Sequence, residues 1–382
     1  MKTKTRNINK VADYVLHVVL VLLALLVLSG ILLSSCTKPT IYTERPISMS
    51  LTMPGTKGVI NNNDDFNNQG TFGVFGYKVQ DKTLVSESSA YHVFTNQEVD
   101  YNNSAWDYTP TKYWDQKTGM HYSFIAYAPY CDSETVGPNV QASMEFAVSP
   151  EGTSYYALKM NNVPSWQDAS SNDCKDIMIS NPEWGFGTDF VGKQNKPCYV
   201  EFTFKHILAL IDLKAYVADG MEYKVSNISV GKNSNNYKVP TADSENTYSQ
   251  GILRKTTDET TWIDPTKSIG ETGIAEWHNS AADHTKDIEL DPDTDVEGTP
   301  KLINKQLAFP FSVEKLSMSV TFLRQGSVEY DTVDKDINLS NIESGKHYTI
   351  ILRFEGGDVV DVNVSEVQDW ITVNQEHPVY NW

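Results

Sequence analysis

Short runs in which apolar and polar residues alternate constrain the fold of this chain more than any other feature. In the first run, the apolar row consists of Ile47, Met49, Leu51 and Met53. Residues 316–322 repeat the same alternation near the other end of the chain. Because successive side chains of a strand point to opposite faces of a sheet, a period of two predicts strands with one buried face. The 20 tyrosines and 8 tryptophans also favour sheets. The sequence therefore predicts an all-β fold.

The N-terminus has the organisation of an export leader. Residues 1–10 carry four basic side chains, residues 15–33 are almost entirely apolar, and the small residues Ser34 and Ser35 precede Cys36. This order is typical of a cleaved secretory signal, and the run resembles the bacterial lipobox, in which the cysteine becomes the acylated first residue. An uncleaved transmembrane anchor is the alternative, because about 18 apolar residues can span a bilayer. Both readings place residues 36–382 outside the cytoplasm, and the lipobox resemblance makes Cys36 the expected lipid (palmitate) attachment site.

Net charge argues against a nucleic-acid partner. Without residues 1–35 the chain keeps 27 basic and 48 acidic side chains, a net charge of −21. Binding to a phosphate backbone needs clustered Lys and Arg side chains, and here the excess has the opposite sign.

The cysteines do not form a disulfide framework or a zinc site. Cys131, Cys174 and Cys198 remain after the leader, so at most one internal disulfide is available, and no CxxC spacing occurs. We expect these cysteines to behave mostly as small buried apolar residues.

Chain length favours two domains. The 347 residues that follow the leader at 1–35 are many for one compact core. A break in the pattern near residues 193–197 precedes the longest apolar run, so we predict a leader at 1–35 and domains at 36–195 and 196–382. Residues 207–216 could form a helix, but the alternation just before them favours a strand buried on both faces. The polar stretch at 232–301 is expected to be an insertion or loop.

The sequence shows no catalytic motif and no strong metal-binding motif. HExxH, GxSxG, Walker and GxGxxG patterns are absent, so no enzyme activity, cofactor or metal is expected. His278 and His284 are the closest histidine pair and are interpreted as solvated side chains. Residues 291–298 resemble the opening of a calcium loop, but Val296 stands where the turn needs glycine and Leu302 where a closing Glu is needed. An ordinary acidic loop is the preferred interpretation.

Aromatic residues cluster between residues 91 and 129. Trp106, Tyr108, Tyr113 and Trp114 could stack on sugars if they were exposed along one face, which would make the chain a surface glycan-binding lipoprotein. Their placement on predicted strands favours a core role instead.

Several motifs together resemble the fimbrillin family, the lipoprotein pilins of Gram-negative anaerobes that build type V pili. The segments that carry this resemblance are 72–77 (FGVFGY), 99–101 (VDY), 106–108 (WDY), 112–114 (KYW), 124–129 (FIAYAP), 176–179 (DIMI), 200–209 (VEFTFKHILA), 345–348 (GKHY) and Trp370. The set covers nearly all of the chain after Cys36. Single motifs are loose, but their order is fairly specific.

This resemblance implies two tandem transthyretin-like seven-stranded β-sandwiches and a structural, non-enzymatic role in adhesion. Family members reach the outer membrane as lipoproteins. A protease then removes the N-terminal segment with its first strand, and a strand of a neighbouring subunit fills the groove, as in β-augmentation. The expected partners are other fimbrial subunits in a homo- or heteropolymer, the outer membrane through the lipid, and a host or bacterial surface receptor. The expected location is the cell surface, and the fimbrium after processing.

The resemblance also maps processing onto this chain. The displaceable strand would be Ile47 to Met53, and the donor strand would come from residues 370–382. Family members are cut after arginine in the loop that follows the first strand, whereas this chain has Lys57 there. Arg45 precedes both the strand and a proline, so Lys57 and Arg45 are the two candidate processing sites. Pro378 interrupts the donor segment, because proline has no N–H for the ladder. An anchor or tip subunit fits these departures as well as a stalk subunit.

Overall fold

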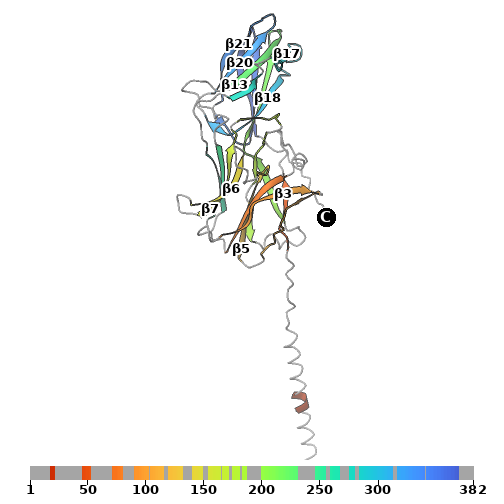
Figure 1. Ribbon diagram of the computed structural model, residues 1–382, viewed down its shortest axis with the longest axis vertical. Helices are drawn as coiled ribbons and strands as arrows, with labels where there is room; N and C mark the ends of the chain where they lie inside the picture. The colour runs from red at the N-terminus through yellow and green to blue at the C-terminus, as the bar shows by residue number, and fades with distance from the viewer. Residues whose placement is uncertain are drawn as a thin grey trace, which may run out of the picture. The chain divides into compact units, whose positions relative to one another are not determined.

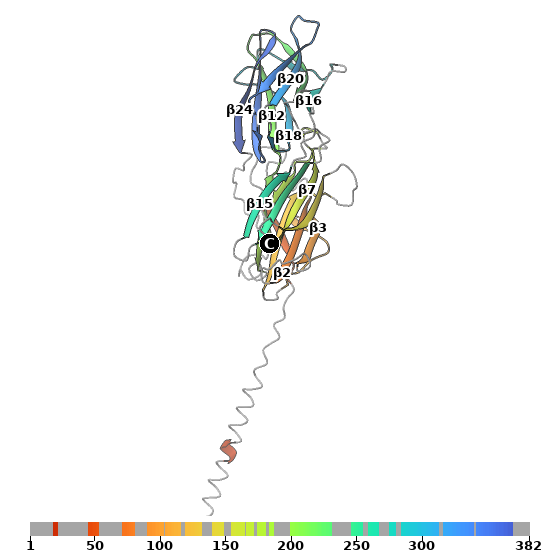
Figure 2. The same ribbon diagram turned by 90° about the vertical axis from the view of Figure 1, so that its left-hand side faces the viewer.

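The protein is an all-β molecule, as the alternation predicts. The computed structural model describes residues 18–21, 45–52, 71–80, 90–102, 104–115, 119–131, 140–148, 154–164, 166–171, 174–180, 183–186, 199–230, 246–254, 259–266, 275–279, 284–312, 316–339 and 341–369. The chain divides into two compact units, Met1–Glu44 and Arg45–Trp382. The described strands lie in the second unit, which Figures 1 and 2 show from two directions.

The largest sheet has eight strands. Their order is β1-β11-β9-β5-β2-β3-β4, and β10 pairs with β5. The strands are β1 (Ser48–Thr52), β2 (Thr71–Gln80), β3 (Ala90–Asn102), β4 (Ala105–Asp107), β5 (Met120–Ala128), β9 (Met178–Ser180), β10 (Glu183–Phe186) and β11 (Tyr199–His206). Every residue of the central strand β5 is buried. Apolar side chains therefore cover both faces of this sheet.

Each face of the eight-stranded sheet has its own core. On one face, Phe72, Phe124 and Phe202 pack with residues of β1. On the other face, Phe75 and Tyr127 pack against a four-stranded sheet of order β15-β14-β7-β6. That sheet consists of β6 (Gln141–Val148), β7 (Ser154–Val163), β14 (Asn246–Arg254) and β15 (Glu259–Thr266). This second face is the interior of a β-sandwich.

Two glycines of β2 make room for aromatic rings on neighbouring strands. A Cβ atom on Gly73 would lie 2.3 Å from the Tyr127 ring, and one on Gly76 would lie 2.6 Å from the Phe124 ring. Both aromatic residues are the direct β5 partners of these glycines. The FGVFGY motif therefore has a packing explanation, because each glycine lies under a large ring of the next strand.

Two five-stranded sheets enclose a further core. Their orders are β24-β23-β12-β18-β8 and β16-β13-β20-β21, with β17 pairing to β13. The first consists of β8 (Trp166–Asp168), β12 (Ala209–Val217), β18 (Lys301–Ala308), β23 (Lys346–Glu355) and β24 (Asp358–Asp369). The second consists of β13 (Tyr223–Val230), β16 (Ala275–Asn279), β17 (Ile288–Leu290), β20 (Leu316–Arg324) and β21 (Asp331–Ile337). A short pair, β19 (Phe311–Ser312) and β22 (Asn341–Ile342), completes the fold.

The structure confirms some local predictions and corrects another. Residues 209–217 form a central strand, β12, whose first five residues are all buried, so the helical alternative is wrong. Gly356 and Gly357 form a two-residue hairpin turn between β23 and β24, and both have positive φ angles. The polar stretch 232–301 is not only a loop, because it contains β14, β15, β16 and β17. The sequences of β14 and β15 do not alternate between apolar and polar residues, so a period of two does not reveal them.

Strand pairing links segments that are distant in the sequence. The short strand β8 pairs with β18, and β14 pairs with β7, so each pairing joins a segment before residue 195 to one after residue 196. The predicted domain boundary itself lies outside the described residues. The division at 195 and 196 therefore stays a prediction.

Candidate functional site

The first strand lies at an edge of the eight-stranded sheet. Residues 48–52 of β1 pair in parallel with residues 199–203 of β11, and β11 separates β1 from the rest of the sheet. Ile47 is 1% exposed, Met49 is 6% exposed, and Leu51 packs partly against the same core. The first two residues of the predicted apolar row are therefore buried and the third is partly buried, in a strand with β11 as its one ladder partner among the described strands.

A second segment holds the residues just before β1. We call residues 108–114 the clasp. The amide of Ile47 donates a hydrogen bond to the carbonyl of Lys112 (2.8 Å), and the amide of Trp114 donates one to the carbonyl of Arg45 (3.0 Å). Pro46 and Tyr113 face one another between these two bonds as an antiparallel bridge. Residues 45–52 therefore contact two segments: residues 45–47 contact the clasp, and residues 48–52 pair with β11.

Tyr108 closes the contact between the clasp and β1. Its hydroxyl donates a hydrogen bond to the carbonyl of Ile47 at 2.6 Å and lies 3.4 Å from the amide of Lys112, from which it accepts. The side chain is 8% exposed, and burial raises the pKa of Tyr108 to about 12. The hydroxyl is therefore protonated at neutral pH and remains a donor.

Aromatic packing fixes the position of the clasp. The Tyr108 ring meets Phe94 edge-on at 5.1 Å, and the Trp114 ring meets Tyr122 at 4.9 Å. After the clasp, the amide of Asp115 donates to the Tyr122 hydroxyl at 2.7 Å. Edge-to-face pairs of this kind add to the stabilisation that burial gives. The clasp, which contacts residues 45–47, is therefore packed against the core of the eight-stranded sheet.

Two carboxylates, one on β10 and one on β11, lie close enough for their charges to interact. Glu183 begins β10, and Glu201 of β11 pairs in register with Ser50 of β1. Burial, with the nearby charge of Glu201, raises the pKa of Glu183 to about 7. The charge of Glu183 therefore changes near neutral pH.

The predicted site residues fall into two groups. Ile47, Met49 and Leu51 come together in one core, and Arg45 adjoins them with an exposed side chain. Cys36, Met53, Lys57 and the donor segment 370–382 lie outside the described residues. Sequence reasoning missed the clasp, although it had singled out 106–108 and 112–114 as family-like motifs. The spacing of those motifs gave no sign that they contact residues about 60 positions earlier.

The aromatic residues proposed for sugar stacking do not form an exposed platform. Tyr108 and Trp114 are buried, Trp106 packs partly against the core, and Tyr113 is 49% exposed. The glycan-binding alternative required all four residues to share one exposed face. It is wrong for this set, because two of the four rings fill the core next to β1.

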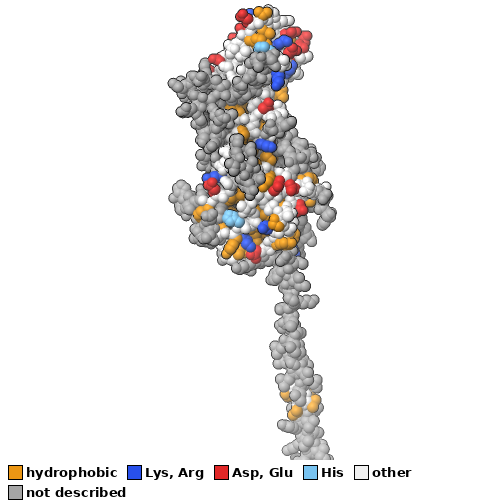
Figure 3. All heavy atoms as spheres, viewed as in Figure 1, with side chains coloured by type: hydrophobic (Ala, Val, Ile, Leu, Met, Phe, Trp, Pro, Cys, Tyr) orange, Lys and Arg blue, Asp and Glu red, His pale blue; other side chains and the backbone are white. Residues whose placement is uncertain are grey.

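The acidic loop after β17 uses its carboxylates for local contacts. Asp291 accepts a hydrogen bond from the amide of Asp293 at 2.8 Å, and Asp295 accepts one from the amide of Asp291 at 2.9 Å. Lys301 lies 3.5 Å from Asp295. Within the described residues no group of three potential ligands converges on a metal site. Figure 3 shows acidic side chains gathered at the end of the unit that carries β17 and β21.

His284 makes structural contacts with residues of neighbouring segments. Ser226 and Asp287 both approach Nδ1 of His284, at 3.2 and 3.5 Å, and the ring stacks on Tyr330 at 4.1 Å. A Ser-His-Asp relay needs its serine and its carboxylate on different ring nitrogens, so this group does not have that geometry. The side chain of His278 lies outside the described residues, so its pairing with His284 stays untested.

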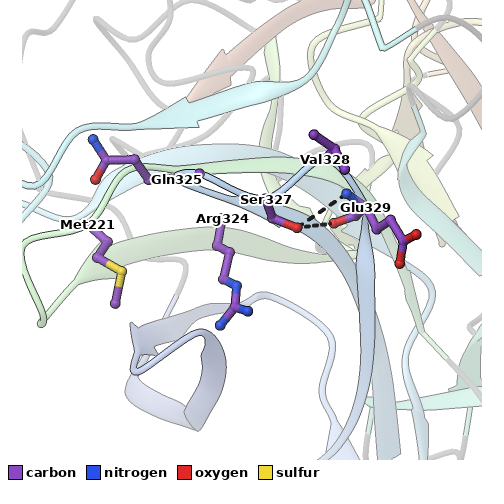
Figure 4. Close-up of a pocket in the computed structure, with 7 residues that line it drawn as sticks. Met221, Arg324, Gln325, Ser327, Val328 and Glu329 are labelled. Carbon is purple, nitrogen blue, oxygen red and sulfur yellow. Dashed lines mark hydrogen bonds between the residues drawn. The ribbon is translucent and has the colours of Figure 1, made fainter.

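One depression of about 450 Å³ lies at the tip between β20 and β21. Figure 4 shows that Arg324 and Val328 point to opposite sides of the ribbon, and that Ser327 bonds to Glu329 beside it. Because these side chains do not converge, the depression offers no set of groups for chemistry.

Two cysteines are described, and both are free thiols. Cys131 and Cys174 are half-buried and pack against the sandwich core. Burial raises the pKa of Cys131 to about 11 and that of Cys174 to about 12. Thiols with such values are unreactive at neutral pH. Cys198 lies outside the described residues.

The leader falls almost entirely outside the described residues, which include positions 18–21 as a helical turn. No helix among the described residues is long and apolar enough to cross a membrane.

Comparison with known proteins gives a matching family model and several similar solved structures. A family model described as fimbrillin-like matches residues 56–370. No curated protein matches the chain. A candidate cell adhesion protein from Bacteroides uniformis has 14% identity and a TM-score of 0.43, over 87% of this chain and 100% of that chain. A candidate cell adhesion protein from Bacteroides ovatus has 13% identity and a TM-score of 0.42, over 87% and 100%. The tip fimbrial protein Mfa3 from Porphyromonas gingivalis has 9% identity and a TM-score of 0.36, over 85% and 100%.

The TM-scores of these three structures are below 0.5, so the structures carry no functional argument. The family model identifies the family. That match covers most of the chain and includes the clasp, β11 and β23. It agrees with the resemblance that the motifs between residues 72 and 348 had indicated. The chain belongs to the fimbrillin-like family.

Proposed function

We propose that the protein is a structural subunit of a surface fimbrium, anchored first through Cys36 and assembled by exchange of its first strand. Membership in the fimbrillin-like family supports a fimbrial or adhesive role and a cell-surface location. The role is structural and involves no catalysed reaction. In the proposed sequence of events, proteolysis frees residues up to the loop after β1, and a strand from another subunit then fills the groove.

The observation that carries this proposal is the placement of β1. It is a short edge strand that buries Ile47 and Met49, and residues 53–70 separate it from β2. Each buried side chain contributes about 1.5 to 3 kcal/mol. A cut in the 53–70 segment would turn β1 into a separate peptide held only by non-covalent contacts. Its departure would expose an apolar row and unpaired backbone groups, which favours an incoming strand.

Lys57 is the better of the two candidate processing sites. The carbonyl of Arg45 is already bonded to the amide of Trp114, and Pro46 follows directly. A protease that binds its substrate as an extended strand would have to break this bridge first. Cleavage after Arg45 would also leave the whole of β1 in place. Cleavage after Lys57 removes the lipid and β1 together.

N-terminal analysis of surface-exposed protein tests the proposal. We expect the processed chain to begin at Gly58 and to migrate as ladders that resist mild denaturant. Lys57→Ala should block processing and ladder formation, whereas the matched control Arg45→Ala should leave both unchanged. Intact, acylated, monomeric protein as the sole surface form would exclude a stalk role.

A further inference from the structure

A four-residue pattern of the clasp-bound segment recurs near the C-terminal end of the sequence. Residues 44–47 read Glu-Arg-Pro-Ile, and residues 376–379 read Glu-His-Pro-Val. Of the 16 prolines in the chain, Pro46 and Pro378 are the two followed directly by Ile or Val. Both also have Glu two positions earlier. The segment that the clasp holds therefore has a second version in the same chain.

The hydrogen-bond pattern of the clasp explains why proline is accepted at this position. Ile47 donates to Lys112, and Arg45 accepts from Trp114, so the residue between them makes no ladder bond to the clasp. Pro46 occupies that position opposite Tyr113. A proline one residue later would remove the bond to Lys112, because proline has no N–H. The clasp therefore accepts proline at position 46 and disfavours it at position 47.

The remaining contacts of the clasp can also be made by residues 376–379. Ile47 is 1% exposed, and valine at this place is one methylene smaller and keeps the β-branched shape. The Tyr108 hydroxyl binds the carbonyl of residue 47, a group that every residue has. The bonds to Lys112 and Trp114 also use backbone atoms only. In this register Val379 would fill the site of Ile47.

The likeness stops after that position. Asn381 would stand where Met49 is 6% exposed, and an amide side chain there would lose hydrogen bonds to water. The similarity is therefore confined to the part of the site that the clasp forms, and it does not extend along β11.

We infer that the clasp is the docking site for residues 376–379 of a second copy of this chain, with Pro378 opposite Tyr113 and Val379 in the place of Ile47. This inference rests on the proposed strand exchange and adds its register. Pro378 would interrupt the hydrogen-bond ladder of a regular donor strand, whereas at the clasp it occupies the position that tolerates proline. Recognition depends on the Tyr108 hydroxyl and on the position of the proline.

Photo-crosslinking in the full chain tests this register. Tyr113 is replaced by p-benzoylphenylalanine, since its side chain is exposed and its backbone faces Pro46. A recognition sequence for a site-specific protease replaces residues 55–60, so that cleavage does not depend on Lys57. Equal amounts of ¹⁴N- and ¹⁵N-labelled protein are mixed, cut and irradiated, and the linked peptides are identified by mass spectrometry. A sample irradiated before cutting serves as the reference.

Before cutting, we expect crosslinks to residues 44–48 of the same copy. After cutting, crosslinks should move to residues 376–380, and pairs of light and heavy copies should appear. Val379→Asp should lower the yield of the second product roughly tenfold or more, because it would bury an unpaired charge. Val379→Ile should keep the yield. The matched control Val373→Asp should also keep it, because in this register residue 373 lies six positions before the pocket.

Two kinds of failure can be told apart. If the cut protein forms oligomers but crosslinks to residues 371–373, or if Val373→Asp blocks assembly while Val379→Asp does not, the register is wrong and strand exchange stands. Crosslinks from residue 113 to residues 376–380 within one copy would overturn the role of a second copy. If the cut protein stays monomeric and keeps its crosslinks to residues 44–48, strand exchange itself fails.

Discussion

The strands β1 and β24 are both at the edge of a sheet, but they are held in different ways. The strand β1 has five residues and pairs in parallel with β11, about 150 positions later in the chain. The strand β24 has 12 residues and pairs with β23 through a two-residue turn. A parallel pair needs a long connection, whereas an antiparallel pair can be joined by a hairpin. The first strand therefore depends on distant partners, and the last depends on its immediate neighbour.

A tyrosine hydroxyl fixes each of the two strands. Tyr108 binds the carbonyl of Ile47 beside β1. Tyr223 donates to Asp219 at 2.6 Å and accepts from the amide of Gly357 at 3.0 Å in the β23–β24 turn. Burial raises the pKa of both tyrosines to about 12, so both hydroxyls stay protonated. A buried tyrosine hydroxyl thus holds β1, which we propose is released by chain cleavage, and also holds the turn before β24, which stays joined to β23 by its hairpin.

The largest expected difference follows from truncating one side chain beside each strand. Phe354 of β23 is 0% exposed and packs against Tyr223 and Phe322. Phe354→Ala should lower the free energy of unfolding by about 3–5 kcal/mol. Met49→Ala should mainly loosen β1, because the sheet beyond β11 keeps its own core. Denaturant titration gives the global value and hydrogen exchange the local one. An equal loss of global stability in both variants would contradict the comparison.

The rigidity of the sheet that carries β1 can be tested at Gly73. An alanine there would place its Cβ against the Tyr127 ring. This ring is held in place because its hydroxyl forms hydrogen bonds with Asn96 and Cys131. Gly73→Ala should lower the free energy of unfolding by about 1–3 kcal/mol. Gly298→Ala is the control, because nothing lies within 4 Å of its added Cβ. Thermal unfolding compares the two, and a similar midpoint for both would show that the sheet relaxes.

Removing each tyrosine hydroxyl tests whether amide protection changes more in β1 than in β24. Tyr108→Phe leaves the ring but removes the donor to Ile47, at a cost of about 1–2 kcal/mol. Amides of residues 47–52 should then exchange faster with deuterium. In Tyr223→Phe, amides of β24 should remain protected, because the hairpin to β23 is intact. Protected β1 amides in Tyr108→Phe would show that β11 alone holds the strand.

The smallest expected effect is the dependence of stability on pH through Glu183. The pKa of Glu183 is about 7 in the folded protein, mainly through burial and also through Glu201, and about 4.3 when unfolded. Between these values the folded state binds more protons, so stability falls as pH rises through this window. Solvent screens part of the interaction, so Glu183→Gln should add on the order of 1 kcal/mol at pH 8. Denaturant midpoints at pH 5 and pH 8 measure this. A wild-type midpoint that does not fall with pH would contradict it.

Sequence reasoning succeeded where the pattern was local. The alternation at 47–53 predicted a strand with one buried face, and the alternation before residue 207 favoured the strand that is now seen as β12. It failed at 246–290, where polar strands lack a visible period, and at Tyr108 and Trp114, whose exposure depends on a distant segment. The clasp was not predictable from spacing, because its partners lie about 60 positions earlier and meet it only when the sheet is assembled.

The sequence by itself determined the all-β class, the apolar row of the first strand and the family. These properties follow from side-chain periodicity and from motif order, and both are local. Only the tertiary structure decided that the clasp and β11 together hold the first strand and the residues just before it. It also decided that Tyr108 and Trp114, which could have stacked on sugars, are buried in the core. The physical reason is that burial and hydrogen bonding at an edge strand depend on which distant segments come to lie beside it.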